Sequence, residues 1–340
     1  GGGGGAVQAL QWASTPEDVL AVFDAHAVKL SEAHVTTALL RLAKMLTPDS
    51  AGELRARLVT DPRLLAMVEA AAAGTSPERL ADAVLAAALL STTDSGGELR
   101  ARLGTVVERV LHADPSPQLL STLAWASEAL SLPLHPPLAR ARHALPFRVL
   151  QRSCADVSFA DLLAEVPIQF DEMVTVHGQV VTEQRGTAWL SDDPACSFPY
   201  SGKVMQPSAM TPGVAAIRDQ LHTLLGVRFD GVLVNLYPEG STHMRFHSDP
   251  DQGELWTSTT AVVSVGDTRV FAFREIADVT RRHTFHVRTG DVVVMFDDCQ
   301  ACFQHAILKE DKLQTGARIS LVFKEAVSLR SSPQPLHLPA

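Results

Sequence analysis

The chain has 340 residues, of which 46% are hydrophobic and 20% charged, a composition typical of globular proteins and not of disordered or fibrous ones. Its net charge of −9 is spread over both halves, with 13 Lys and Arg against 15 Asp and Glu in residues 1–150, and 16 against 23 in residues 151–340. This balance excludes a protein that holds nucleic acid through general basic charge, so any such contact must be local.

The first 14 residues, beginning "GGGGGAVQAL", predict a flexible glycine-rich start. The apolar run "LADAVLAAALL" is too short to cross a bilayer and contains Asp82, so we expect no membrane segment. The four cysteines are too few and too scattered for a disulfide framework, which favours a reducing compartment. A plastid, a mitochondrion, the nucleus and the cytoplasm all satisfy this condition.

Residues 15–130 have a helical pattern, with apolar side chains at helical spacing in "VTTALLRLAKML". Ser14 or Thr15 followed by Pro16 is typical of a helix cap and a first-turn proline. The run "ELRARLVT" at 53–60 returns as "ELRARLGT" at 98–105, and "SPERL" at 76–80 returns as "SPQLL" at 116–120. The two offsets, 45 and 40 residues, are typical of stacked helix pairs. We therefore predict a helical repeat domain, with an alanine-rich bundle as the alternative.

These units, together with "EAHVTTALLRLAKM", resemble the degenerate helical repeats of octotricopeptide and RAP-associated proteins of organelles. The resemblance implies RNA binding along the surface of a solenoid. Repeat solenoids also bind proteins, so RNA and protein both stay open as partners of this part.

The segment "SLPLHPPLARARHALP" contains four prolines, which a continuous helix does not tolerate, and predicts a Pro-rich linker over residues 131–150. From residue 151 to 328 the pattern changes to short β-type runs such as "GVLVNLY" and "RVFAFRE", separated by turns. Many short strands favour a sandwich or barrel over a parallel sheet. One strong helix is predicted at "PGVAAIRDQLHTLLG", and residues 329–340 are interpreted as a tail.

The stretch "RFHSDPDQG", residues 245–253, places His247 and Asp249 two positions apart. In a strand such residues share one face, and together they supply two-thirds of the two-histidine, one-carboxylate triad that holds Fe(II). Alone, this spacing is more often a polar surface pair. His305 follows the predicted buried strand "TGDVVVMF", and Arg318 begins the run "RISLVFK". This ordered set predicts an iron site.

Residues 155–326 resemble the AlkB family of Fe(II)/2-oxoglutarate dioxygenases through motifs in the family's order: "TAWLSDDPACSFPYSG", "NLYPEGSTHMRFHSDPD", "VVSVGDTRVFAFR", "GDVVVMF", "QHAI" and "RISLVFK". The resemblance implies a double-stranded β-helix, or jelly roll, with helices bracing one side. It also implies Fe(II), 2-oxoglutarate and O2 as cofactor and cosubstrates. The predicted fold is thus multidomain, an all-α repeat or bundle followed by a jelly-roll domain with flanking helices.

The resemblance assigns roles residue by residue: His247, Asp249 and His305 as iron ligands, and Asn235, Tyr237, Arg318, Ser320 and Lys324 as contacts of 2-oxoglutarate. Arg318 matches the arginine that pairs with the far carboxylate of 2-oxoglutarate, a bidentate geometry that lysine does not reproduce. Lys324 stands where the family usually has a second arginine, and Ser320 where it often has asparagine. These departures could weaken or reshape binding of the cosubstrate.

The function that the resemblance implies is oxidative dealkylation of bases in single-stranded DNA or RNA, with release of formaldehyde, succinate and CO2. The resemblance implies that the segment from Trp189 to about Tyr200 is a lid that faces the nucleotide. Trp189 of this lid matches an aromatic side chain that stacks on an extruded base, and Asp251 matches an acid that reads the base edge. The plainer interpretations are a core tryptophan for Trp189 and a solvated turn residue for Asp251.

Two further features have open interpretations. Five arginines between positions 269 and 288 are either solvated strand ends or a rim that contacts phosphates. Cys299 and Cys302 form a lone C-x-x-C, which favours buried or half-buried thiols over zinc, and the turn residues before His243 argue against a zinc site with His247. The competing functions are a repeat protein that binds RNA or protein and carries a degenerate oxygenase domain, and an oxygenase directed at proteins.

Overall fold

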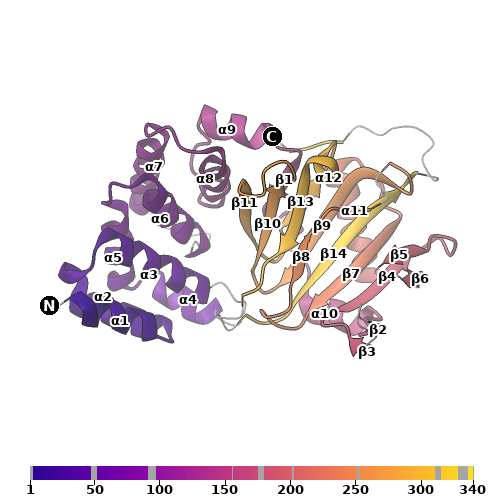
Figure 1. Cartoon of the computed structure of the whole chain (residues 1–340), viewed down its shortest axis with the longest axis horizontal. Helices are drawn as coiled ribbons and strands as arrows, with labels where there is room; N and C mark the ends of the chain where they lie inside the picture. Colours follow the sequence, from indigo (N-terminus) through magenta and orange to yellow (C-terminus); the bar gives the residue numbers. More distant parts are fainter. Residues whose placement is uncertain are drawn as a thin grey trace. The chain divides into compact units, whose positions relative to one another are not determined.

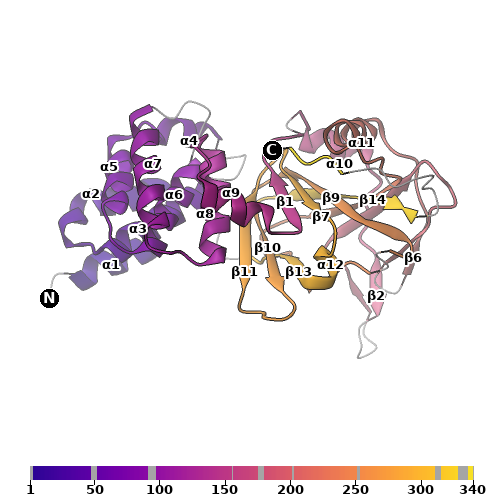
Figure 2. The same ribbon diagram turned by 90° about the horizontal axis from the view of Figure 1, so that it is seen from above.

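The computed structural model divides the chain into two compact units, Gly1–Leu145 and Pro146–Ala340, which we describe separately (Figure 1, Figure 2). It describes residues 3–46, 52–90, 97–154, 156–174, 180–200, 203–250, 253–310, 315–327 and 336–339. Among these residues, no helix combines the length and the apolar character that a membrane crossing requires.

The described part of the first unit is helical. Its helices are α1 (Gly3–Trp12), α2 (Pro16–His26), α3 (Glu32–Met45), α4 (Gly52–Leu58), α5 (Pro62–Ala72), α6 (Pro77–Leu90), α7 (Gly97–Leu111), α8 (Pro117–Ala129) and α9 (Pro136–His143), with a 3-10 turn, η1, at Ala27–Lys29. Helices α2 and α3, α5 and α6, and α7 and α8 pack as consecutive pairs. One row therefore contains α2, α5 and α7, and the other contains α3, α6 and α8.

Local sequence signals explain where these helices begin. Thr15 caps α2: its hydroxyl accepts a hydrogen bond from the backbone N–H of Asp18, whose carboxylate accepts one from the N–H of Thr15, both at 3.1 Å. The repeated "SPERL" and "SPQLL" lie at the starts of α6 and α8, which occupy the same row. The repeated "ELRARL" lies in α4 and α7, two helices of different length.

Two predicted segments near the domain ends need correction. Within the predicted flexible start, Gly3–Trp12 form the helix α1, which buries Ala6 and Leu10. The Pro-rich segment contains α9, which tolerates Pro136 and Pro137 because both lie in its first turn, where no N–H partner is required. The second unit also begins inside the predicted linker, since the strand Phe147–Leu150 already pairs within its sheet.

The second unit is built from antiparallel strands. They are β1 (Phe147–Leu150), β2 (Glu172–Val174), β3 (Val180–Thr182), β4 (Gly186–Ser191), β5 (Phe198–Tyr200), β6 (Lys203–Met205), β7 (Gly231–Tyr237), β8 (Met244–His247), β9 (Trp256–Gly266), β10 (Arg269–Glu275), β11 (Arg282–Val287), β12 (Val292–Met295), β13 (Phe303–Ile307) and β14 (Arg318–Ala326). A six-stranded sheet has the order β1-β12-β9-β14-β7-β4, and a four-stranded sheet has the order β11-β10-β13-β8. Two short ribbons, β2-β3 and β5-β6, complete the unit.

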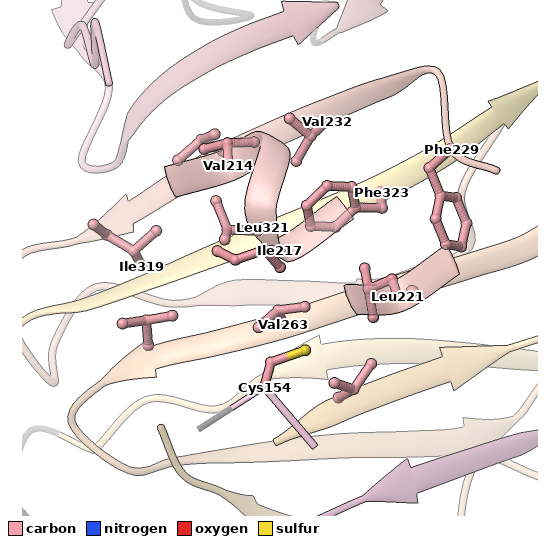
Figure 3. Close-up of a cluster of buried hydrophobic side chains, with 14 of the residues drawn as sticks. Cys154, Val214, Ile217, Leu221, Phe229, Val232, Val263, Ile319, Leu321 and Phe323 are labelled. Atoms are coloured by element: carbon pink, nitrogen blue, oxygen red, sulfur yellow. The ribbon is translucent and has the colours of Figure 1, made fainter. Parts of the chain in front are cut away.

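Alternation along the central strand β14 separates the core from the functional face. Ile319, Leu321 and Phe323 point into the main apolar cluster, where the predicted helix α11 (Pro212–Leu225) covers the sheet with Ile217 and Leu221 (Figure 3). A second helix, α10 (Phe159–Glu165), contributes Leu162 to the same cluster. Because side chains alternate across a strand, the even-numbered residues of β14 share the opposite face of the sheet.

Gly231 at the start of β7 lies directly against the ring of Trp189, which is stacked on Phe198 and donates from Nε1 to the carbonyl of Cys196 at 2.6 Å. A Cβ at position 231 would overlap the ring, so the buried indole, stacked on Phe198, would have to shift. We therefore expect Gly231→Ala to lower the free energy of unfolding by about 1–3 kcal/mol, measured by urea titration.

Gly104→Ala is the matched control, because Gly104 lies inside α7 and a Cβ there meets no atom within 4 Å apart from its chain neighbours and the backbone of its own helix. Alanine stabilises a helix interior relative to glycine, so this variant should be as stable as the unaltered chain or more so. Equal stability of Gly231→Ala and the unaltered chain would contradict the described packing of Trp189.

Candidate active site

Two histidines and one aspartate converge at one end of the four-stranded sheet. His247 is the last residue of β8 and lies directly opposite His305 of β13, so the two imidazole centroids are 4.3 Å apart. The Nε2 atoms of both histidines lie 3.6 Å from Oδ1 of Asp249, and the ligand atoms of the three residues lie within 4.8 Å of one another. Asp249 lies two residues beyond the end of β8, so it does not share one strand face with His247, contrary to the prediction from their spacing.

Burial and charge set the protonation of this group. Burial lowers the pKa of His305 to about 3, so its imidazole is neutral near pH 7. Burial is the largest influence on Asp249 and acts to raise its pKa, but the positive charge of Lys324 and the interactions with His247 and His305 together outweigh it, and the pKa of that carboxyl lies well below its usual range. An ionised carboxylate beside a neutral imidazole is the state in which these side chains bind a divalent metal.

Lys324 reaches the group from the other sheet. It lies on β14, only 3% of its surface is exposed, and its Nζ is 2.8 Å from Oδ2 of Asp249. One carboxylate oxygen is thus occupied by the lysine, and the other faces both imidazoles. This arrangement fits a metal bound through one oxygen of Asp249 and two histidine nitrogens, with further positions left for other ligands.

The residues predicted to contact 2-oxoglutarate lie on the same face of β7 and β14. Asn235 pairs in register with Ser320, and Tyr237 with Arg318. All four side chains are buried. Ser264 of β9 pairs with Ser320 on the other side and belongs to the same face. A serine inside the hydrophobic run "TAVVSVG" carries no sequence signal of such a position, so the sequence did not identify Ser264.

Arg318 is the charged centre of this face. It is 0% exposed, donates from Nη2 to Oγ of Ser264 at 2.8 Å, and lies 5.3 Å from the centre of the Tyr237 ring. Its Nε and Nη1 have no hydrogen-bond partner among the described residues. Burial lowers the pKa of Arg318 to about 10, which still leaves it charged near neutral pH. Buried N–H groups of a charged guanidinium that lack hydrogen-bond partners are suited to bind a carboxylate. Nε and Nη1 of Arg318 therefore fit one carboxylate of a small dianion such as 2-oxoglutarate.

The three predicted substrate residues have different outcomes. Trp189 is 2% exposed and lies among Phe198 and Trp256, so the structure places it in the core and leaves neither face of its ring open to a base. This placement matches the plainer interpretation of the residue. The side chain of Tyr200 and the whole of Asp251 lie outside the described residues.

Arg269, the first of the five clustered arginines, is a buried structural residue. It donates to the carbonyls of Gly240 at 3.2 Å and Thr242 at 2.7 Å, in the loop that joins β7 to β8, and pairs with Glu310 at 3.2 Å. Arg269 therefore fixes the loop that leads to His247 and does not belong to a solvent-exposed rim. Two others have acidic neighbours: Arg281 pairs with Glu275 at 3.3 Å, and Arg288 lies 3.9 Å from Asp291.

Comparison with known proteins gives a consistent result. A sequence profile of the 2OG-Fe(II) oxygenase superfamily matches residues 148–324, just over half of the chain. The "Uncharacterized protein R406" of Acanthamoeba polyphaga mimivirus is 30% identical over 181 residues, which cover 53% of this chain and 93% of that protein. The "DNA oxidative demethylase ALKBH2" of Bos taurus is 32% identical over 181 residues, covering 50% of this chain and 64% of the relative. The "Alpha-ketoglutarate-dependent dioxygenase alkB homolog 3" of Bos taurus is 28% identical over 180 residues, covering 50% and 61%. The match thus spans less than two thirds of either Bos taurus protein.

Proposed function

This chain belongs to the 2OG-Fe(II) oxygenase superfamily and is an AlkB-like dioxygenase that uses Fe(II), 2-oxoglutarate and O2, and from that premise we propose that it removes methyl groups from nucleic-acid bases by oxidation. The observation that carries the proposal is the convergence of His247, Asp249 and His305 in a unit that also buries the partly unpartnered Arg318. His247, Asp249 and His305 hold the metal, and Arg318 anchors the far carboxylate of 2-oxoglutarate.

Bound Fe(II), 2-oxoglutarate and O2 supply the oxidant that turns an N-methyl C–H bond into C–OH, while 2-oxoglutarate becomes succinate and CO2. The resulting N-hydroxymethyl group then loses formaldehyde: its C–N bond breaks, the electron pair returns to the ring nitrogen, and the hydroxyl proton is transferred there. The chain's own contribution is to hold the ligands in their binding state. Lys324 contributes to keeping the carboxylate of Asp249 ionised and binds its Oδ2, which leaves Oδ1 toward the two imidazoles.

A nucleic-acid substrate is supported by a surface that we call the arginine–phenylalanine patch: Arg274, Phe246 and Arg282. The guanidinium of Arg274 lies 4.3 Å and that of Arg282 5.5 Å from the centre of the Phe246 ring. The two arginines are direct cross-strand partners, and among the described residues neither forms a salt bridge with a carboxylate. Like charges that face each other across two strands destabilise a sheet, so an anion bound between the two arginines would reduce their electrostatic repulsion.

The patch lies on the face of the four-stranded sheet opposite to the metal ligands, so a strand of nucleic acid bound to it would reach the metal site around the edge strand β8. Phe246 is the neighbour of His247 on the edge strand β8. Arg274 also contacts Gln304, the neighbour of His305, with 2.9 and 2.7 Å between its nitrogens and Oε1 of the glutamine. Phosphate contacts from arginine position a nucleic acid without reading its sequence, which allows an acidic protein to bind it locally.

We expect the double variant Arg274→Gln/Arg282→Gln to raise KM for a methylated oligonucleotide about 10-fold or more. The slope of log Kd against log salt should also fall, by the amount that corresponds to the loss of one or two phosphate contacts. KM and the slope of log Kd against log salt are measured on the same oligonucleotide. Arg281→Gln is the control, because Arg281 is exposed and already paired with Glu275. An unchanged salt slope in the double variant would remove the patch from the substrate path.

The substrate class is tested by a screen of methylated single-stranded DNA and RNA oligonucleotides for formaldehyde release by the full chain. Release from DNA assigns the protein to repair, and release from RNA assigns it to RNA modification. Succinate formed with a protein extract but with none of the oligonucleotides would favour the protein-directed oxygenase. A metal-loaded chain that forms no succinate under any condition would favour a degenerate domain beside a binding solenoid.

Two finer predictions on the fold belong to the same proposal. Phe147 of β1 stacks on Phe273 of β10 with 3.7 Å between ring centroids, and Lys324 joins β14 to Asp249, so side chains of the two sheets meet between them. These contacts support a jelly roll. The two rows of paired helices in the first unit support a repeat solenoid, whose RNA or protein partner stays a prediction.

A further inference from the structure

The metal ligand Asp249 lies outside the regular hydrogen-bond ladder of its sheet. Strand β8 is an edge strand that ends at His247, and Pro250, which has no N–H, follows Asp249. His247 and His305, by contrast, are held by the register of paired strands. A carboxylate on such a segment needs other contacts to keep its place, since ligands of a metal must be held to within about 0.5 Å.

A short turn of helix, α12 (Cys299–Cys302), supplies one such contact through Gln300. Oε1 of Gln300 accepts a hydrogen bond from the backbone N–H of Asp249 at 2.9 Å. The other end of the same amide is directed as well, because Nε2 donates to Sδ of the buried Met295 at 3.4 Å. The two contacts fix which atom of the amide faces Asp249.

A second contact comes from the residue that follows this turn. Oγ of Ser248 donates to the carbonyl of Phe303 at 3.1 Å, where α12 meets β13. The turn is itself anchored, since Cys299 is buried and its N–H bonds to the carbonyl of Phe296 at 3.1 Å. Both residues after His247 are therefore attached to the α12–β13 junction, which also leads to His305.

We propose that Gln300 is a positioning residue for the metal site, which presents Asp249 to the metal by holding its backbone N–H. Asp249 is then fixed at two points, its backbone by Gln300 and its Oδ2 by Lys324, and Oδ1 is left toward the imidazoles. Partners of this kind, which touch a ligand and not the metal, commonly contribute 10–100-fold to metal affinity. The proposal rests on the metal site alone and is independent of the substrate class.

The test is the affinity of the full chain for Co(II), used as an O2-stable substitute for Fe(II) and followed by its visible absorption without substrate. Gln300→Met keeps the length of the side chain and removes the acceptor, so we expect about 10–100-fold weaker binding. Gln300→Glu keeps an acceptor atom at the same place, and we expect its affinity to equal or exceed that of the unaltered chain, since an added negative charge attracts a dication.

Gln304→Met is the matched control. Gln304 lies next to His305 on β13, on the opposite face of the strand, and binds Arg274, so its loss should leave Co(II) affinity unchanged. Melting temperatures of all variants separate a local effect from unfolding, and Ser248→Ala, with its smaller contact, replaces any variant that does not fold. Unchanged affinity in Gln300→Met, or equal weakening in Gln300→Met and Gln300→Glu, would overturn the proposal.

Discussion

Replacing His247 by alanine is expected to abolish the conversion of 2-oxoglutarate to succinate. The variant removes one of the two imidazole nitrogens that lie 3.6 Å from Oδ1 of Asp249, and leaves one imidazole and one carboxylate. Since loss of a mere supporting partner costs 10–100-fold in metal affinity or activity, loss of a ligand should cost at least about 100-fold. Succinate formation at saturating Fe(II) and 2-oxoglutarate is the measurement.

His243→Ala is the control for this prediction. His243 lies in the loop before β8 and its Nδ1 contacts the carbonyl of Ser241 at 3.2 Å, so it belongs to the same region but not to the group of ligands. It should retain turnover. Full turnover by His247→Ala would mean that the metal is held elsewhere.

Replacing Arg318 by methionine is expected to raise KM for 2-oxoglutarate about 100-fold or more without weakening metal binding. Arg318 presents two buried donors that lack partners among the described residues, and hydrogen bonds to a charged group contribute about 1.5–3 kcal/mol each. Loss of about 3 kcal/mol corresponds to about 100-fold in affinity. Arg318→Lys should be intermediate, since it keeps a charge and loses the two-pronged geometry.

KM for 2-oxoglutarate and Co(II) affinity are measured on the same preparations. Arg218→Met on α11 is the control, because Arg218 pairs with Asp192 at 2.8 Å and Asp219 at 3.2 Å and belongs to the helix that covers the other face of the sheet. An unchanged KM in Arg318→Met would show that another cation anchors the cosubstrate. Loss of Co(II) binding would instead indicate that the site as a whole had collapsed.

The metal site could be predicted from the sequence because its residues have strong chemical identity and a fixed order. His247, Asp249, His305 and Arg318 are polar residues within or just beyond short hydrophobic runs, where polar side chains are conspicuous. The direct pairing of β8 with β13, which brings the two imidazoles together, depends on the folded sheet and is invisible in the spacing.

Other features could not be predicted because neighbouring residues of one type receive different environments. Arg269 and Arg274 are five positions apart in one strand, yet one is buried among carbonyls and the other lies on Phe246. Gln300 stands between two cysteines that draw attention to thiol chemistry, and only the fold brings its amide to Asp249, 51 positions away. Trp189 was predicted from the family resemblance to stack on a base, whereas core packing against Gly231 and Phe198 decides its place.

The ion pair between Lys324 and Asp249 links the affinity of the site for the metal to its affinity for the keto acid. The single carboxylate of the ligand set is already neutralised by a lysine, and Arg318 adds a further buried positive charge. A divalent cation therefore enters surroundings that carry no net negative charge to attract it, and a dianion enters surroundings that are positive in advance. Each species lowers the electrostatic cost of the other, so metal and keto acid should bind with positive cooperativity, and each should raise the affinity for the other by the same factor.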